Sequence, residues 1–209
     1  IGIMNENGDL TASNQVPLRT INSRDLEVFQ AQENAVTDNL VIGKPIVGRA
    51  SGQWLIQMSR RINKVDGSFG GIVIVGVDPR YVAEFYKQVD LGEQSLISLV
   101  GHDGIVRVRR AGDDIKIGVD IQNQLIMEEL TVTLSGTVSE TSPVDGIKRI
   151  ISFYNLGDYP LAVMVGMTEV EVFADLNHRV ASYVLLCGLM SVVIALFVGL
   201  LLIGVPVVP

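Results

Sequence analysis

The sequence predicts an α+β fold in which two tandem modules with antiparallel sheets are followed by one transmembrane helix. Two stretches share a pattern of apolar run, glycine, polar residue and helix-like continuation: IVIVGVDPRYVAEF at 72–85 and AVMVGMTEVEVFAD at 162–175. Only the second is followed by thirty residues without a charge, 180–209. The repeat indicates two related modules, and the uncharged tail indicates a membrane span.

Turn signals divide each half of the chain into hairpins. Residues 1–13 form two short predicted strands around Asn7-Gly8, and QWLIQMSRRI turns at 65–67 into FGGIVIVGV. In the second half, 96–110 repeat this design around Asp103-Gly104, and KRIISFYNL turns at 157–158 into PLAVMVGM. Asn-Gly and Asp-Gly favour tight hairpins because both central residues adopt positive φ. Each half therefore offers a hairpin, a variable middle, a second hairpin and a helix.

The helices after the second hairpins carry capping signals. Asp78-Pro79 places a carboxylate at the N-cap and a proline at the first helical position. Thr168-x-x-Glu171 is a capping box at the equivalent point. We expect the first helix to end at Gly92 and to turn one apolar face inward, made by Tyr81, Val82, Phe85, Tyr86 and Val89.

Two further helical segments are predicted. One starts at Ser23 and reads SRDLEVFQAQEN, with Leu26 and Phe29 inward. The other has no Gly or Pro from Glu169 to Cys187, so we expect it to run unbroken toward the membrane. Residues 182–203 are apolar, and 22 helical residues extend about 33 Å, which is enough to cross a bilayer core. A buried core helix is the alternative interpretation.

Composition argues against several classes of function. The net charge of −7 lies entirely on residues 1–179, which disfavours nucleic acid as a partner. The two histidines, His102 and His178, have no neighbours in the pattern of a catalytic triad or a metal site, and no phosphate-binding loop is present. We therefore expect no enzyme activity, no cofactor and no metal. A secreted or anchored hydrolase is the least favoured hypothesis.

Residues suited to ligand binding gather in the first half. Arg49, Trp54, Gln57, Ser59 and two arginines lie within VGRASGQWLIQMSRR, and an aromatic wall beside a guanidinium suits a small organic anion. Strand alternation puts Leu55, Gln57, Ser59 and Arg61 on one face. The alternative is that Trp54 belongs to the core and the arginines to the surface.

Three motifs carry a resemblance to a known family. IGKPIVGR, SRR…DGSFGG and SPVDGIKR, within residues 1 to about 179, resemble the double Cache (PDC-type) extracytoplasmic sensor domains that precede histidine kinases, diguanylate cyclases and chemoreceptors. The resemblance implies two PAS-like modules outside the cell, a membrane-distal one that holds the ligand and a membrane-proximal one joined to the membrane. It explains why the chain repeats its strand-and-helix pattern.

The sequence also departs from this family. Relatives commonly have Asp-Arg-Glu-Tyr-Phe where this chain has Asp25-Leu26-Glu27-Val28-Phe29, and a following His is Gln32. The resemblance implies that the missing arginine would hold a ligand carboxylate and that Asp78 would hold an amine. Arg24 or Arg49 would have to substitute for the arginine. We expect a long N-terminal helix with its own membrane span, typical of the family, to precede Ile1.

These observations lead to one hypothesis and one alternative. We expect an extracytoplasmic signal-sensing domain of a bacterial receptor, with a membrane-distal module at 1–91, a proximal module at 92–168, a juxtamembrane helix at 169–181 and the span at 182–203. The receptor would lie in the inner membrane with 1–179 outside, form a homodimer through 177–184, and bind its ligand in the distal and not the proximal module. The alternative is a membrane-tethered interaction or scaffold module without a small-molecule ligand. The candidate ligand-binding residues are Arg24, Phe29, Arg49, Trp54, Gln57, Ser59, Asp78 and Tyr81.

Overall fold

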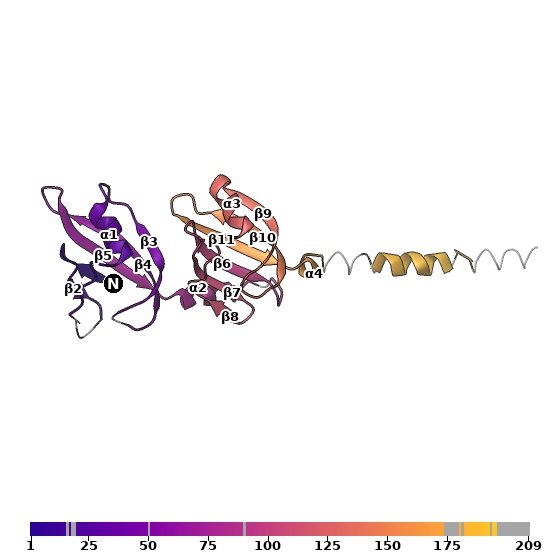
Figure 1. Ribbon diagram of the computed structural model, residues 1–209. Helices are drawn as coiled ribbons and strands as arrows, with labels where there is room; N and C mark the ends of the chain where they lie inside the picture. Colours follow the sequence, from indigo (N-terminus) through magenta and orange to yellow (C-terminus); the bar gives the residue numbers. More distant parts are fainter. Residues whose placement is uncertain are drawn as a thin grey trace, which may run out of the picture. The chain divides into compact units, whose positions relative to one another are not determined.

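The computed structural model of the chain describes residues 1–15, 17, 20–49, 51–89, 91–173, 180, 182–192 and 194–195. It divides into two compact units, Ile1–Thr168 and Glu169–Pro209. The first unit contains two antiparallel sheets with their helices (Figure 1). The predicted α+β class with two antiparallel sheets is therefore confirmed.

The first module is a five-stranded antiparallel sheet with one helix on its inner face. The strand order is β2-β1-β5-β4-β3, so that β1 joins the β4–β5 hairpin along β5. The helix α1 contacts β3, β4 and β5. The elements are β1 (Gly2–Met4), β2 (Leu10–Ser13), α1 (Glu27–Asn34), β3 (Val41–Val47), β4 (Trp54–Asn63) and β5 (Phe69–Val77).

Both predicted hairpins of this module are present. The β1–β2 turn has Gly8 at φ 86°, and the β4–β5 turn has Gly67 at φ 82°. Among the described residues only glycines have a positive φ, so Asn7 does not adopt the conformation expected of both central turn residues. The Asp66 carboxylate accepts hydrogen bonds from the Ser68 backbone and hydroxyl at the second turn. Gly71 adopts φ 119°, and a Cβ there would lie 2.0 Å from the Met4 carbonyl oxygen. Only glycine therefore permits β1 to approach β5 this closely.

The first helix begins later than the sequence indicates. Its first residue is Glu27 and not Ser23, and Leu26 at the N-cap makes no side-chain capping bond. Residues 23–26 form a turn instead, because the Ser23 amide donates to the Gly8 carbonyl of the β1–β2 hairpin. Phe29 is fully buried and meets Phe69 edge to face, with ring centroids 5.4 Å apart. The expectation that Phe29 faces inward is confirmed.

The second module is a six-stranded antiparallel sheet in the order β8-β7-β6-β11-β10-β9. Both predicted hairpins, β6–β7 and β10–β11, are present, with Gly104 at φ 72° in the first turn. The helix α3 and strand β9 are not predicted by the sequence and lie within the variable middle. The elements are β6 (Leu96–Gly101), β7 (Val106–Ala111), β8 (Asp114–Lys116), α3 (Leu125–Val132), β9 (Ser135–Thr141), β10 (Lys148–Asn155) and β11 (Leu161–Met167).

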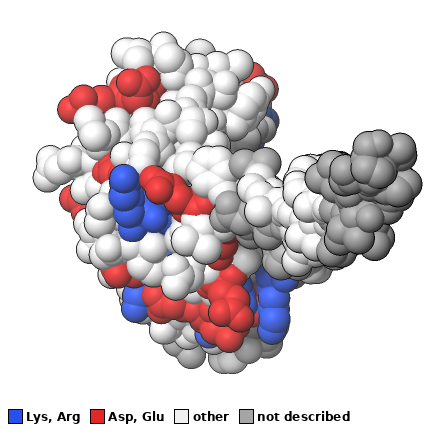
Figure 2. Space-filling view, turned by 90° about the vertical axis from the view of Figure 1, so that its right-hand side faces the viewer, with Lys and Arg blue, Asp and Glu red and all other residues white. Residues whose placement is uncertain are grey.

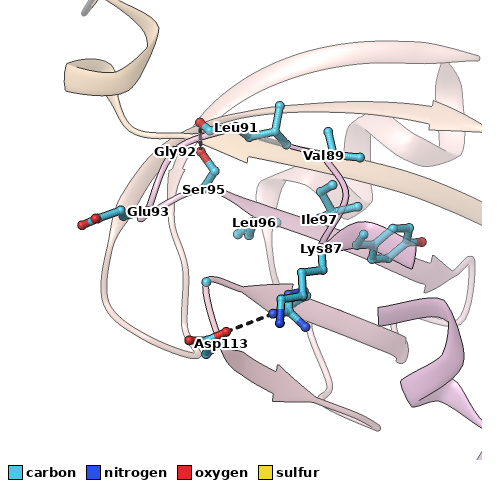
Figure 3. A pocket seen from close by; sticks show the side chains of 12 residues that line it. Lys87, Val89, Leu91, Gly92, Glu93, Ser95, Leu96, Ile97 and Asp113 are labelled. Carbon is cyan, nitrogen blue, oxygen red and sulfur yellow. Dashed lines mark hydrogen bonds and ion pairs between the residues drawn. The ribbon is translucent and has the colours of Figure 1, made fainter. Parts of the chain in front are cut away.

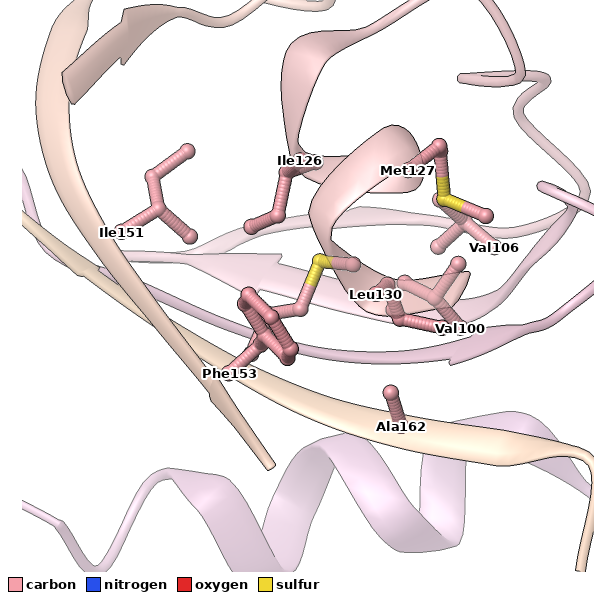
Figure 4. Close-up of a cluster of buried hydrophobic side chains, with 9 residues drawn as sticks. Val100, Val106, Ile126, Met127, Leu130, Ile151, Phe153 and Ala162 are labelled. Atoms are coloured by element: carbon pink, nitrogen blue, oxygen red, sulfur yellow. The ribbon is translucent and has the colours of Figure 1, made fainter. Parts of the chain in front are cut away.

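The core of the second module lies between α3 and the inner face of the sheet. Figure 4 shows Ile126, Met127 and Leu130 of α3 directed toward side chains of the strands. Burying aliphatic and aromatic side chains of this size stabilises a fold by about 1.5–3 kcal/mol each. The strand residues of this cluster are Val100, Val106, Ile151, Phe153, Ala162 and Met164.

The helix α2 (Pro79–Tyr86) lies between the two sheets in the sequence and contacts β4 and β7. Its start is as predicted, because Asp78 caps it by accepting from the Arg80 amide at 2.9 Å. The predicted end of the helix and its predicted inward face are wrong, since the helix ends at Tyr86 and buries Pro79 and Ala83. Tyr81 and Phe85, expected inside, are 80% and 63% exposed. The amphipathic pattern therefore identified a helix but not the face that packs.

The second unit begins with α4 (Glu169–Val172), which directly follows Thr168. Residues 182–192 are helical, but the expected unbroken helix, the span at 182–203 and the dimer segment at 177–184 include 174–179, 181, 193 and 196–203, which lie outside the described residues. Among the residues that are described, the structure contains no helix that is both long and apolar enough to cross a membrane. The span at 182–203 stays a prediction.

Candidate functional site

The first module contains a cavity of about 110 Å³ on the inner face of its sheet. Its floor is formed by β1, β3, β4 and β5, and its roof by residues between β2 and the start of α1, namely Asn14, Gln15, Ile21, Ser23 and Leu26. The lining residues are Ile1, Gly2, Met4, Leu10, Ser13, Asn14, Gln15, Ile21, Ser23, Leu26, Ile46, Gly48, Arg49, Leu55, Gln57, Ile74 and Gly76. Of the eight candidate residues, the structure brings Arg49 and Gln57 together here.

Strand alternation and two glycines create this cavity. Leu55 and Gln57 of β4 line it, while Ser59 and Arg61 further along the same face bond to α1, so the predicted alternation holds. A Cβ at Gly48 or Gly76 would lie 2.6 Å or 2.9 Å from a Leu55 methyl group. The absence of side chains at these two positions therefore leaves room for Leu55 and for the space beside it.

An ion pair fastens the roof to the sheet at one edge of the cavity. Arg49 donates to both carboxylate oxygens of Asp25, at 2.8 Å to Oδ1, and also donates to the Asn22 carbonyl oxygen at 2.9 Å. The hydrogen bonds from Arg49 lower the pKa of Asp25, and Asp25 in turn raises the pKa of Arg49. Both groups stay charged at neutral pH. A bidentate guanidinium–carboxylate pair holds its partners in one geometry.

The other six candidate residues lie away from this cavity. Phe29 and Ser59 are buried between α1 and the sheet, where the Ser59 hydroxyl donates to the Val28 carbonyl at 3.0 Å. Arg24 pairs with Glu33 at 2.7 Å. Trp54 and Tyr81 are exposed, and Asp78 is half-buried at the start of α2.

Two of these residues have contacts that the sequence did not indicate. The outer edge of the Trp54 ring lies close to Gly118 of the second module, 3.8 Å from the position of a Cβ there. The Asp78 carboxylate caps α2 and also pairs with the Arg80 guanidinium at 2.7 Å, which lowers its pKa. The negative charge of Asp78 is therefore already paired, and a ligand amine would compete with Arg80 for this carboxylate.

A wide groove of about 550 Å³, which the sequence does not indicate, lies where the chain passes from α2 into β6. Figure 3 shows Lys87, Glu93 and Asp113 around it. Arg110 on its wall donates to Asp113 at 3.1 Å and lies 3.6 Å from Glu84 of α2. Arg110 is thus already paired, and its pair with Glu84 links α2 to the second module.

The outer surface carries more acidic than basic area on the face shown in Figure 2, in keeping with the net charge of −7. Within the described part of the chain, no group of three or more His, Cys, Asp or Glu side chains is placed to hold a metal ion. The first-module cavity, in contrast, combines an apolar floor with a few polar groups. This combination suits a small organic molecule.

Comparisons with known proteins place this geometry among sensor domains. A family model described as a histidine kinase sensor domain, dCache_1-like, matches residues 79–166. The extracellular domain of rpHK1S-Z16, a protein assigned as a histidine kinase, is 30% identical with a TM-score of 0.76, covering 82% of this chain and 71% of that one. No curated protein sequence matches the chain.

Two more distant structures share the fold. The periplasmic sensory domain of the Campylobacter jejuni chemoreceptor Tlp1 is 15% identical with a TM-score of 0.61, covering 77% of this chain and 62% of that one. The ligand-binding domain of the Pseudomonas aeruginosa amino-acid chemoreceptor PctB, solved with L-Gln, is 14% identical with a TM-score of 0.60, covering 87% of this chain and 74% of that one.

Proposed function

Because the chain belongs to the double Cache family of extracellular sensor domains, we propose that it senses a small organic molecule for a bacterial transmembrane receptor. The first module would be membrane-distal and the second membrane-proximal. The observation that carries the proposal is the first-module cavity, whose roof is held by the Arg49–Asp25 pair. A ligand that entered it would touch the sheet and the roof at the same time.

The cavity limits the size of the ligand. One water molecule needs about 10–15 Å³ of such space, so 110 Å³ has room for roughly ten atoms of that size. Small amino acids and organic acids fall in this range. Arg49 remains the group suited to a ligand carboxylate, and an anionic ligand would have to draw it from Asp25. PctB, which shares the fold, was solved with an amino acid.

The fold offers a short route from the cavity to the second module. Gly76 lines the cavity, and the chain reaches the α2 N-cap two residues later at Asp78. Glu84 of α2 then lies 3.6 Å from Arg110 on β7. A ligand that shifted β5 would therefore act on α2 and through it on the second sheet, and we infer that the signal continues into the helix after Thr168.

The receptor hypothesis includes a membrane span and a homodimer. The uncharged segment 180–209 supports an inner-membrane location with 1–179 outside. The proposal keeps the domain boundaries at 91/92 and 168/169. Apolar and small residues recur every three or four positions from Val170 to Val184, with Asn177 in the same line. This is a helix-pairing pattern, and one polar residue in it fixes register. The output domain would be separate from this chain segment, which itself has no catalytic role in the proposal.

A screen of small metabolites by thermal shift tests ligand binding. A molecule that binds only the folded protein raises its melting temperature. The full chain, kept in detergent, should respond to at least one amino acid or organic acid, and Gln57→Leu should reduce that response because it removes a polar group from the cavity. Gln30→Leu is the matched control, since Gln30 is exposed on α1. Equal responses of the two variants would remove the cavity from the binding site.

One observation favours the second candidate function, a membrane-tethered module without a small-molecule ligand. The cavity is below the 300–1,000 Å³ of typical ligand sites by roughly threefold or more. Both charged groups expected to hold a ligand, Arg49 and Asp78, already have partners. A screen in which no metabolite raises the melting temperature would support this candidate.

A further inference from the structure

The second module contains a smaller cavity of about 40 Å³. It lies between the inner face of the sheet, the N-terminal end of α3 and the segment that joins β9 to β10. Most of its wall is apolar, but two serines, an arginine, a glutamine and a glutamate also reach it. The lining residues are Leu96, Ser98, Val106, Arg109, Ile121, Gln124, Ile126, Glu140, Ser142, Pro143, Val144, Ile151 and Met164.

A bulge in the sheet brings Arg109 into this cavity. The register between β6 and β7 shifts between Leu99 and Val100, so that Arg109 lies opposite Ser98 while Val106 lies opposite Val100. Arg109 therefore shares the inner face with core residues, and it is only 3% exposed. A guanidinium buried to this degree requires partners for its N–H groups.

One end of the Arg109 guanidinium lacks such a partner. Its Nη2 donates to the Asp145 carboxylate, but the buried Nη1 has no hydrogen bond among the described residues. The Asp114 carboxylate is 3.9 Å from Nη1, which is beyond hydrogen-bond distance. An unsatisfied buried donor costs free energy, so a ligand that accepts a bond from Nη1 gains affinity.

Two buried guanidiniums beside the cavity, those of Arg109 and Arg149, share one carboxylate. Asp145 is shared, because Arg149 also holds it through Nη1 and Nη2, each at 2.9 Å. Arg149 is 1% exposed and gives its Nε–H to the Gln94 carbonyl. Glu140 adds a negative charge, but its Oε2 accepts from the Ile126 amide at 3.2 Å, at the positive end of α3.

We propose that this cavity binds a small carboxylate anion of the size of acetate. Its volume equals about three to four water-sized atoms, which fits a carboxylate with at most a short alkyl group. One carboxylate oxygen would accept from Arg109 Nη1, with the hydroxyls of Ser98 and Ser142 nearby. The alkyl group would face Ile126, Ile151 and Met164.

The sequence motif SPVDGIKR acquires a role in this site. Ser142, Pro143 and Val144 line the cavity, and Asp145, which Arg149 also contacts, accepts a hydrogen bond from the other end of Arg109. The motif sits in the second module, where the sequence predicts no ligand. The proposal is independent of ligand binding in the first module.

The test measures thermal stability of the full chain in detergent during titration with sodium acetate, with sodium chloride at equal ionic strength as the reference. Acetate should raise the melting temperature in a saturable way, and sodium pivalate, whose branched alkyl group exceeds the cavity, should not. Ser98→Val should weaken acetate binding at least tenfold, because it removes a hydroxyl and adds a methyl group to the wall. If Ser98→Val does not fold, Val106→Ile serves as the cavity-filling variant. Gln57→Leu is the control in the first module.

Each result decides for or against the site. Saturable stabilisation by acetate that is lost in the filling variant and kept in Gln57→Leu supports it. No acetate effect beyond that of chloride means that the cavity holds water only, and overturns it. Equal stabilisation by pivalate also overturns it, as does loss of the acetate effect in Gln57→Leu with retention in Ser98→Val.

Discussion

Replacing Asp145 by asparagine should destabilise the second module strongly. The substitution keeps the shape of the side chain but removes the one carboxylate shared by Arg109 and Arg149, which are 3% and 1% exposed. Breaking a buried ion pair by removing one partner costs about 3–5 kcal/mol, since it leaves a charge without compensation. Both guanidiniums lose this carboxylate in the variant, so we expect the upper half of that range.

The effect should depend on pH with a defined sign. Burial alone would raise the pKa of Asp145, but hydrogen bonds from Arg149, the Ile147 amide and Arg109 outweigh it and hold the pKa far below its usual value. The ion pair therefore contributes its full stability above the pKa of an unfolded aspartate, about 3.9. That contribution should decline as the pH falls below about 4, and the wild-type protein should then approach the variant.

Urea unfolding of the full chain in detergent, followed by far-ultraviolet circular dichroism, measures this difference. Asp114→Asn is the matched control, because Asp114 is half exposed and 3.9 Å from Arg109, and we expect a change of at most about 1 kcal/mol. A loss for Asp145→Asn no larger than that of the control at neutral pH would show that Arg109 and Arg149 do not depend on Asp145 for their compensation. A difference from wild type that stays constant down to pH 2 would show that protonation of Asp145 does not control this contribution to stability.

Three further predictions address the first module and the membrane segment. Ser59→Ala should cost about 1 kcal/mol in urea unfolding, because it removes the buried hydrogen bond to Val28, whereas Ser68→Ala at an exposed turn should have no measurable effect. Gly71→Ala should cost at least about 2 kcal/mol, because its Cβ would meet the Met4 carbonyl at a φ of 119°, while Gly157→Ala, with open space at its Cβ, should stay within about 0.5 kcal/mol. Single cysteines from Asn177 to Val184, in a background without Cys187, should crosslink with helical periodicity in the full receptor; uniform or absent crosslinking would contradict the proposed dimer.

Local signals in the sequence predicted local structure well. The four hairpins are where the turn residues placed them, and Asp78 caps α2 as its position before a proline indicated. These features depend on a few adjacent residues, whose backbone preferences are fixed by their own chemistry. The resemblance of IGKPIVGR and SPVDGIKR then identified the family that the comparisons show.

Features set by distant contacts were not predictable in the same way. Ser23 has the chemistry of an N-cap, but its backbone bonds to Gly8 and the helix starts four residues later. In the stretch VRVRR, strict alternation would put Arg109 on the face opposite to Val106. The bulge beside Leu99 changes this and places the two residues on the same face. A register shift depends on the partner strand. The sequence of β7 alone therefore does not indicate that Arg109 lines the cavity of the second module.

The candidate ligand residues show the same limit. Arg49 and Gln57 line one cavity because β3, which precedes Arg49, pairs with β4, which contains Gln57. The sequence predicts the β4 strand but not its pairing with β3. The sequence predicts Asp25 as part of a helix, whereas in the structure it is half of an ion pair. The charge on Arg49 is evident from the sequence, but only the three-dimensional structure identifies Asp25 as the carboxylate that pairs with it.

If the first-module cavity receives a small organic ligand, a calorimetric titration of the full chain with the strongest ligand from the thermal-shift screen will measure its binding. We expect one binding site per chain, whose dissociation constant rises at least tenfold in Gln57→Leu and is unchanged in Gln30→Leu and Ser98→Val. An affinity that is the same in Gln57→Leu as in the wild-type protein would contradict binding in this cavity.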